Sequence, residues 1–595
     1  METLPHWDLA SIYPSITSKE FEADLQAVKA MVPILRTHLG DAGAQKNALK
    51  NWVQEAIRQY QLIWDTLETL GSFANALLTV NTSDETAMRG MNQVEEVSLD
   101  AQAIHVEFLN ILAAHDAAIR ALFASDSELK PLQFAINELL DLQRHQMSEA
   151  EEALAADLNR SGADSWGRLQ EAVSSSAGSV WDEATGERKT VIQLRSMAFD
   201  KDREVRQRAF EKELAIWKLH EVAFAYAING VKGATITLDK RRGYSDPLER
   251  SVQQARITDE VLKALIGAIE TNLPVFRKYL RAKAHALGIP KLAFYDLFAP
   301  VGTSSKEYSY AEAREFIVRN FSDFHKPLGD FAEHAFEHNW IDSESRSGKI
   351  GGAYCTSFPL RKETRVLANF DHSFDGLSTI AHELGHAYHD KVTCGLPALL
   401  RHYPMTLAET ASIFAQYIVF QGALKNADDQ QRLALIENFL QDSTQVCVDI
   451  LSRFYFEKDL FSRRAKGDLM PSELSGMMVD AQKRSYGDAL DETQLHPWMW
   501  AVKGHYYRSG LSFYNFPYAF GQLFGLGVYK LSQQDPEHFG ERYDQLLLLT
   551  GQDSAPVVTA SVGCDITTTA FWQEGIDLIG SYVDEFCALC GYKEK

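Results

Sequence analysis

The most constraining feature of this 595-residue chain is a pair of histidines four positions apart, in the sequence His382-Glu383-Leu384-Gly385-His386. Residues at i and i+4 lie on one face of an α-helix, so both imidazoles can bind one metal ion if the segment is helical. Glu383 lies beside them and can take a proton from metal-bound water. The motif therefore predicts a helix that carries two zinc ligands and a general base.

The residues around the motif favour this helix. Apolar residues recur at helical spacing beside the two histidines: Phe374, Leu377, Ala381, Leu384 and Tyr388. Asp371 or Ser373 can cap the start of the helix. Gly385 in a helix interior costs about 1 kcal/mol relative to alanine, so we expect another backbone or a substrate to come close at this position.

A catalytic zinc ion needs a third protein ligand and an open position. Glu409 meets this need, 23 residues after His386, in a segment that follows Pro404 and has the apolar pattern of a second helix. We therefore expect one Zn²⁺ per chain, bound by His382, His386 and Glu409. The alternative is that the two histidines are hydrogen-bonded core residues and that Glu409 is on the surface.

A further histidine, His389, lies seven positions after His382. Seven residues span about 10 Å along a helix axis, too far for these two side chains to share one ion. We expect His389 to support the structure around the site.

Composition excludes some classes of function. The chain has 59 Lys and Arg against 81 Asp and Glu, a formal charge of -22, which disfavours binding to nucleic acid and to anionic membranes. The N-terminus has neither a basic start nor an apolar run, and the most apolar stretch, Phe513–Tyr529, is interrupted by polar residues and glycines. Of the six cysteines only Cys587 and Cys590 form a C-x-x-C pair, which we expect to be two reduced thiols near a helix end. We expect the chain to be cytoplasmic.

Most of the chain has helical periodicity. Residues 17–158 predict four long amphipathic helices joined by short polar turns. The first is capped within Thr17–Glu20 and ends at Gly40, the second covers 45–80, the third runs from the turn Asn81–Asp84 to about Phe123, and the fourth covers Leu132–Leu158. The composition changes between residues 159 and 200, where two short apolar segments flank Glu183–Gly186 as in a hairpin. We place a boundary here, with an N-terminal helical lobe of residues 1–200 and a catalytic domain of residues 201–595.

Long helical patterns resume at 203–232 and 258–287. Strand candidates at 349–357 and 365–370 come directly before the metal motif. The chain is therefore predicted to be mainly α, with a few short strands beside the motif helix.

Several segments together resemble a known family. They are the motif His382–His389, the downstream Glu409, the opening Trp7–Tyr13 and the late segment His505–Gly521. Over essentially the whole chain they are similar to the oligoendopeptidase F branch of the M3 metallopeptidases, the thimet oligopeptidase-like enzymes. The resemblance implies a mainly α, two-lobed helical ellipsoid of the zincin-like class, with zinc deep in a substrate channel and a small β-sheet beside the HExxH helix. It also implies cleavage of short unstructured peptides.

In that family, a histidine and tyrosines of the late segment lie opposite the zinc and bind the substrate and the developing oxyanion. The resemblance assigns this role to His505 and Tyr514, with Tyr507 and Tyr518 as further substrate contacts. A phenol or imidazole donor at such a place would stabilise charge that develops in the transition state. Each tyrosine could equally be a buried core residue.

The segment Gly351–Thr356 comes shortly before the motif helix. An edge strand can pair with an extended peptide backbone, and glycine lets a peptide come near. Gly352 and Ala353 are therefore candidate substrate-binding residues. An ordinary glycine turn that opens a hairpin is an equal alternative.

These features predict an endopeptidase that hydrolyses internal peptide bonds, with Glu383 as the general base. A zinc carboxypeptidase or other exopeptidase on a related scaffold stays open, and Arg508 is the basic residue of the late segment that could bind a substrate terminus. A non-enzymatic helical binding protein is disfavoured, because a structural zinc site usually has four protein ligands and no base. We expect short peptides as partners, and the sequence leaves the oligomeric state open.

Overall fold

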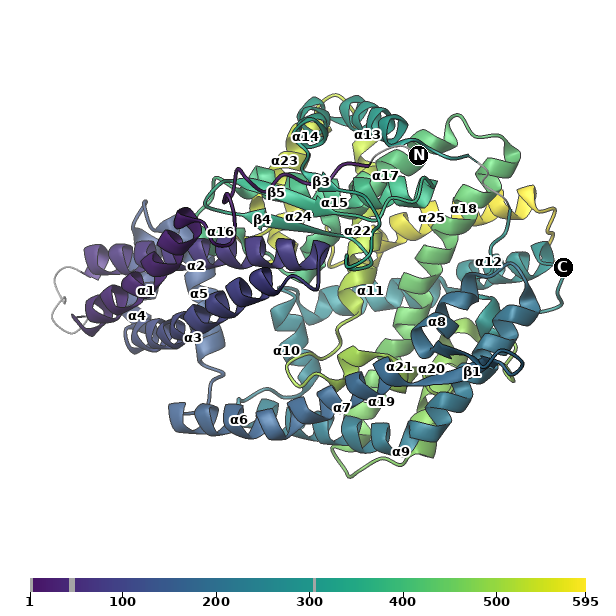
Figure 1. Cartoon of the computed structure of the whole chain (residues 1–595), viewed down its shortest axis with the longest axis horizontal. Helices are drawn as coiled ribbons and strands as arrows, with labels where there is room; N and C mark the ends of the chain where they lie inside the picture. The colour runs from purple at the N-terminus through teal and green to yellow at the C-terminus, as the bar shows by residue number, and fades with distance from the viewer. Residues whose placement is uncertain (1–3, 42–48, 303–305, 595) are drawn as a thin grey trace. The chain divides into compact units, whose positions relative to one another are not determined.

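The structure, a computed structural model, describes residues 4–41, 49–302 and 306–594, and most of these residues are in α-helices (Figure 1). The chain forms two compact units, each built from three separate segments. Unit 1 contains residues 1–144, 306–423 and 531–564, and unit 2 contains residues 145–305, 424–530 and 565–595. The predicted division into residues 1–200 and 201–595 runs along the sequence and stays a prediction.

Unit 1 begins with long helices that pack side by side. Their bounds are α1 (Lys19–Gly40), α2 (Leu49–Val80), α3 (Glu85–Ala114), α4 (Asp116–Ser125) and α5 (Gln133–Gln143). The Ser18 hydroxyl accepts a hydrogen bond from the backbone N–H of Phe21 and starts α1 within the predicted capping segment. Apolar residues such as Trp52, Phe73 and Phe108 are buried between these helices and form the core of this part of unit 1.

The last two of the four predicted long helices are each divided. The pattern that runs to Phe123 is interrupted at His115, between α3 and α4. The pattern from Leu132 to Leu158 is interrupted because Ser148 starts a new helix, α6 (Glu149–Ser161). The Ser148 hydroxyl accepts from the backbone of Glu151, whose side chain accepts from the backbone of Ser148, and this capping box is readable in the sequence. Residues 45–48 of the second predicted helix lie outside the described residues.

A small three-stranded sheet belongs to unit 1. Its strands are β3 (Ile341–Asp342), β4 (Tyr354–Phe358) and β5 (Glu363–Leu367), in the order β3-β5-β4. The central strand β5 pairs in parallel with β3 and antiparallel with β4, where Thr356 lies opposite Arg365. The strand β4 is therefore at an edge of the sheet. Both strands predicted before the motif are present, with shifted bounds.

The remaining helices of unit 1 surround this sheet. Their bounds are α13 (Tyr310–Phe324), α14 (Lys326–Glu337), α15 (Phe374–Thr393), α16 (Ala398–Arg401), α17 (Met405–Leu424), α23 (Phe539–Leu549) and α24 (Ala555–Ala560). Helix α15, which carries the metal motif, packs against β4 and β5 (Figure 1). The predicted mainly α fold with a small sheet beside the motif helix is confirmed, and the deep substrate channel stays a prediction.

Unit 2 is also mainly helical. Its antiparallel hairpin joins β1 (Gly178–Asp182) to β2 (Glu187–Thr190), so the predicted hairpin is present. Val191 and Ile192, which were expected in its second strand, begin the helix α8 (Val191–Ser196) instead. The predicted helix at 203–232 is longer than expected, and the predicted helix at 258–287 is divided at Asn272, because Pro274 lies in the first turn of a new helix. Cys587 and Cys590 are free thiols at the end of the last helix, as predicted.

The helices of unit 2 have these bounds: α6 as above, α7 (Ala163–Ser176), α8 (Val191–Ser196), α9 (Arg203–Arg241), α10 (Pro247–Gln254), α11 (Asp259–Thr271), α12 (Leu273–Ala286), α18 (Asp429–Thr444), α19 (Ile450–Arg464), α20 (Pro471–Tyr486), α21 (Met499–Val502), α22 (Phe516–Ser532) and α25 (Thr569–Leu589). A π-helical turn, η5 (Gln445–Asp449), joins α18 to α19. Short 3-10 turns are η2 (Lys130–Leu132) in unit 1 and η3 (Met197–Phe199), η4 (Phe294–Asp296), η6 (Gly487–Ala489) and η7 (Gly504–Tyr507) in unit 2. Within the described ranges, no helix is long and apolar enough to cross a membrane.

Lys283 in α12 gives a test of the packing of unit 2. Its ammonium is fully buried, 2.5 Å from Glu437 Oε1, and it also donates to the Leu297 carbonyl. Lys283→Met would leave the buried Glu437 carboxylate without its cation, so we expect the free energy of unfolding to fall by about 3–5 kcal/mol. The measurement is urea denaturation, with Lys283→Met/Glu437→Leu as the control. The double variant should recover most of the loss, and an equal loss in both variants would contradict the explanation.

Candidate active site

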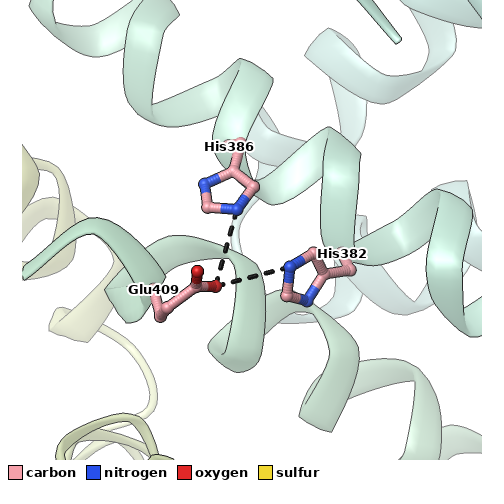
Figure 2. A group of neighbouring side chains, drawn as sticks. All are labelled: His382, His386 and Glu409. Carbon is pink, nitrogen blue, oxygen red and sulfur yellow. Dashed lines mark ion pairs between the residues drawn. The ribbon is translucent and has the colours of Figure 1, made fainter. Parts of the chain in front are cut away.

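Helix α15 presents both motif histidines on one face. The Ser373 hydroxyl accepts a hydrogen bond of 3.0 Å from the Gly376 backbone and starts the helix. Asp371 accepts from the Ser373 hydroxyl at 2.6 Å, so both residues predicted as caps take part. Figure 2 shows the rings of His382 and His386 directed toward a common space. The helix therefore brings two imidazole nitrogens together without any contribution from the rest of the fold.

Glu409, near the start of α17, faces the two histidines (Figure 2). Its Oε2 lies 3.4 Å from Nε2 of His382 and 3.5 Å from Nε2 of His386. One donor atom from each of the three residues lies within 4.8 Å of the other two. Two ligand atoms that each bind zinc at about 2.1 Å in a tetrahedral arrangement are about 3.4 Å apart. The three side chains thus fit a tetrahedral site that keeps a fourth position open.

The backbones of α15 and α17 touch at Gly385. A β-carbon at this position would lie 2.5 Å from the carbonyl oxygen of Ala411 and 2.7 Å from Cα of Ser412. Atoms at such distances overlap, so only glycine allows the two helices to come this close. The backbone approach expected at Gly385 is therefore made by α17, and it carries Glu409 to the histidines.

Two further residues of α17 hold the cluster in place. Oε1 of Gln416 lies 3.2 Å from Nδ1 of His382, and the Ser412 hydroxyl donates to Oε2 of Glu409 at 2.7 Å. Because Oε1 of Gln416 is an acceptor, the ring proton of His382 is on Nδ1. Its Nε2 then carries the lone pair, which is the form of the imidazole that binds a metal. Neither residue was predicted, although Glu409, Ser412 and Gln416 have the i, i+3, i+7 spacing of one helix face.

The sequence left the hydrogen-bonding partners of His382 and His386 open, with Asp375 and Ser378 among the candidates. Asp375 lies seven residues before His382, about 10 Å along the axis of α15, and Ser378 lies one turn before it. Gln416 comes from the neighbouring helix, at the level of the ring.

The charge states of His382 and Glu409 suit metal binding. Burial lowers the pKa of His382 below its usual value, and the charge of His386 lowers it further. Burial alone would raise the pKa of Glu409, but the hydrogen bond and the charge of His386 outweigh it and lower this pKa to about 2. In His386, burial is likewise outweighed by the Glu409 carboxylate, which raises the pKa of the imidazole. Glu409 is therefore ionised and His382 neutral at neutral pH, as ligands must be, whereas the raised pKa of His386 means that this imidazole would release a proton when it binds a metal.

Glu383 has a different environment from Glu409. Its side chain is buried, and burial, with a smaller contribution from the charge of Glu409, raises its pKa to about 7 in spite of the opposing charge of His386. A backbone hydrogen bond from Cys355 on β4 also reaches this carboxyl. A carboxyl group with such a pKa can both accept and release a proton near neutral pH. Glu383 is adjacent in sequence to His382 of the cluster.

The edge strand β4 runs beside this site. Gly352, with φ of +82°, and Ala353 lead into the strand, and the carbonyl of Gly352 accepts a hydrogen bond from Asn369. A recess of about 390 Å³ adjoins the strand and is lined in part by Cys355, Ser357 and Asp390. The binding of substrate by Gly352 and Ala353 stays a prediction.

His389 lies outside the metal cluster. It is fully buried, and its Nε2 is 2.7 Å from the Thr550 hydroxyl and 3.2 Å from the Leu547 carbonyl. Burial lowers its pKa to about 3, so the ring is neutral. Its ring also stacks on that of Tyr403. The residue links α15 to α23, in agreement with a structural role.

The late-segment residues lie in unit 2, whereas the metal cluster lies in unit 1. His505 is in η7, with its ring centre 5.5 Å from that of Tyr514, and the hydroxyls of Tyr514 and Tyr518 are 2.5 Å apart. Tyr507 is fully buried and donates to the Trp500 carbonyl, as a core residue would. The structure therefore groups three of the four predicted residues, and the role of all four in binding substrate stays a prediction.

Two models of known families match the sequence. Peptidase family M3 matches residues 196–578, and Oligopeptidase F matches residues 110–176. The chain belongs to peptidase family M3. The resemblance to its oligoendopeptidase F branch is thus confirmed, and with it the prediction of a metalloendopeptidase.

Relatives in this family match along almost the whole chain. Oligopeptidase PepF of Bacillus subtilis strain 168 is 23% identical over 97% of this chain and 86% of its own length. An oligoendopeptidase F homolog of Lactococcus lactis subsp. lactis is 24% identical over 97% of this chain and 96% of its own. The crystal structure of oligoendopeptidase-F from Enterococcus faecium superposes with a TM-score of 0.68 at 18% identity, covering 95% of this chain and 99% of that one. This structural likeness shows a shared fold.

The helix contact at Gly385 can be tested directly. Gly385→Ala adds a methyl group that must push α15 and α17 apart, so we expect the free energy of unfolding to fall by about 1–3 kcal/mol. The matched control is Gly267→Ala in α11, where a β-carbon meets no atom within 4 Å and stability should be unchanged or slightly higher. Chemical denaturation of both variants makes the comparison. Equal stability of the two would show that the helices do not depend on this contact.

Proposed function

We propose that this family M3 enzyme is a zinc-dependent endopeptidase that hydrolyses internal bonds of short, unstructured peptides. The observation that carries the proposal is the convergence of His382, His386 and Glu409, with nitrogen-to-oxygen distances of 3.4 and 3.5 Å, beside the buried carboxyl of Glu383. Two imidazoles and one carboxylate are the ligands that catalytic zinc sites commonly use, and they leave one position for water or substrate.

In this proposal Nε2 of His382, Nε2 of His386 and Oε2 of Glu409 hold the zinc ion. When bound, zinc supplies a Lewis acid that polarises a carbonyl group and makes water a nucleophile near neutral pH. Gln416 keeps His382 in the correct tautomer, and Ser412 keeps Oε2 of Glu409 directed at the site. Partners of this kind orient metal ligands and raise the affinity for the metal.

Glu383 is proposed as the general base. Its carboxylate accepts a proton from the attacking water and then donates that proton to the nitrogen of the leaving amine. Both transfers need a group whose pKa is near the working pH, and burial raises the pKa of Glu383 to about 7. Glu409 cannot do this work, because its carboxylate has a pKa of about 2 and is hydrogen-bonded to Ser412.

We infer that the substrate backbone pairs with the edge strand β4, near Gly352 and Ala353. Such pairing uses main-chain hydrogen bonds, so it favours an extended, unstructured peptide and makes few demands on its side chains. By the family resemblance, we assign His505 and Tyr514 to hydrogen bonding of the substrate and of the oxyanion that develops in the transition state. Tyr518, which shares a hydrogen bond with Tyr514, is the further candidate.

Glu383→Gln tests the base. The amide keeps the shape of the side chain but cannot accept a proton, so we expect zinc to remain bound and kcat to fall by about 10²-fold or more. Cleavage of an internally quenched peptide, blocked at both ends, is followed by fluorescence and by mass spectrometry of the products. Asp375→Asn, on the same helix but outside the cluster, is the control and should keep its activity.

Three outcomes of that experiment are informative. Near-normal activity of Glu383→Gln would refute the assignment of the base. Trimming of free-ended peptides without any cut in the blocked peptide would favour an exopeptidase. Bound zinc without any cleavage would refute the proposed activity.

Metal removal tests the ligand set. Zinc at about 100 times its dissociation constant should add roughly 2.7 kcal/mol to the stability of the folded state, so a chelator should lower Tm and abolish cleavage, and added zinc should restore both. We expect Ser412→Ala to weaken zinc binding about tenfold and Glu409→Gln to weaken it much more. Competition with a coloured chelator measures these affinities. Equal affinity of all three proteins would exclude Glu409 as a ligand.

A further inference from the structure

His505 in unit 2 makes one side-chain hydrogen bond through its imidazole. Its Nε2 lies 2.8 Å from Nδ2 of Asn515, the residue directly before α22. The other ring nitrogen, Nδ1, makes no hydrogen bond within the described part of the chain. Asn515 itself is buried. Which ring nitrogen of His505 carries the proton therefore depends on whether the oxygen or the nitrogen of the Asn515 amide faces it.

Arg453 decides the orientation of that amide. Its Nη1 lies 3.3 Å from Oδ1 of Asn515. A guanidinium group has only donors, so the atom of the amide that faces Arg453 must be the oxygen. The NH₂ group of Asn515 then faces His505.

Arg453 is in turn fixed by Asp449. The two residues form a buried ion pair one helical turn apart. Asp449 also accepts hydrogen bonds from Gln445 at 2.7 Å and from Tyr486 at 3.2 Å. Gln445 and Asp449 are the first and last residues of the π-helical turn η5, a kind of turn that is frequent at functional sites. If the Arg453 guanidinium rotated away, the Asp449 carboxylate would be buried without its cation, which is costly in free energy.

This chain of contacts sets the tautomer of His505. Because the Asn515 NH₂ group is a donor, Nε2 of His505 must accept, so the ring proton is on Nδ1. A second proton on Nε2 would face the N–H of Asn515 and lose the hydrogen bond. The imidazole is therefore neutral and offers one N–H, at Nδ1, to a ligand.

The charged groups around His505 also favour its neutral imidazole. Burial and the positive charges of Arg453, Lys232, Lys503 and Arg508, in decreasing order of effect, lower the pKa of its imidazole to about 2. These cations come from α19, from α9 and from the segment of His505 itself. The aromatic neighbours are the rings of Tyr506 and Tyr514.

We propose that Asn515, oriented by Arg453, is a positioning residue that holds His505 as the neutral Nδ1–H tautomer, a hydrogen-bond donor to a substrate oxygen. In this role His505 stabilises negative charge on the substrate and transfers no proton, and the proton transfers are left to Glu383. The assignment to substrate rests on the proposed function, whereas the tautomer rests only on contacts within unit 2.

The tautomer is measured first, by NMR of the full-length protein labelled with ¹⁵N-histidine. The His505 signals are identified by their loss in His505→Gln. Two-bond couplings distinguish a protonated Nδ1 from a protonated Nε2, and an imidazolium has a third pattern. We expect Nδ1–H in the wild type at neutral pH. A protonated Nε2, or an imidazolium, would overturn the proposal whatever the activity of the enzyme.

Two variants of Asn515 then test its positioning role. Asn515→Asp has the same shape, but its carboxylate accepts from Nε2–H, so the tautomer should invert. Asn515→Leu makes no hydrogen bond, so the ring should populate both tautomers. Both variants should retain zinc affinity and the unfolding midpoint of the wild type to a close approximation. If Asn515→Leu fails to fold, the isosteric Asn515→Asp still decides the question.

Cleavage of the blocked quenched peptide completes the test. We expect both variants to lower kcat by about tenfold or more with little change in KM, because the donor acts on charge that develops in the transition state. Ordinary kcat in a variant with an inverted tautomer would overturn the role in catalysis. If the wild type cleaves no peptide, the proposed function fails, and the NMR result still decides whether Asn515 sets the tautomer.

Discussion

The contact between α15 and α17 at Gly385 is the constraint on which the metal cluster depends. The two backbones can touch because glycine has no β-carbon, and any larger residue would overlap with Ala411 and Ser412. This approach lets short side chains reach across from one helix to the other. Glu409 and Gln416 reach the histidines of α15 in this way, and Ser412, on the same face of α17, donates a hydrogen bond to Glu409. The absence of a side chain at Gly385 thus allows the side chains of α17 to reach the histidines of α15.

The same helix pair gives two glutamates opposite properties. Glu409 is hydrogen-bonded to Ser412 and lies next to His386, which keeps its pKa at about 2, whereas burial raises the pKa of Glu383 to about 7. Different environments thus keep the Glu409 carboxyl ionised and give the Glu383 carboxyl a pKa near neutral pH. The division of labour that we propose follows from hydrogen bonding and burial, because the two side chains are chemically identical.

In unit 2, neighbouring side chains likewise fix the orientation of buried polar groups. A buried ion pair between Asp449 and Arg453 orients the amide of Asn515, and the amide orients the proton of His505. Each step leaves one arrangement of donors and acceptors, because a guanidinium cannot accept and a carboxylate cannot donate. A network of this kind can hold an imidazole in one tautomer.

The sequence by itself determined the local features of this protein. Helical spacing put His382 and His386 on one face, and capping residues such as Ser18 and Ser373 set where helices begin, because these effects act within a few residues. Spacing and family resemblance also pointed to Glu409, while the capping box at Ser148 was readable but missed. Only the tertiary structure decided that Gln416 contacts His382 and that Asn515 contacts His505. Such contacts depend on how helices pack and on which side chains are buried together, and no local pattern encodes that.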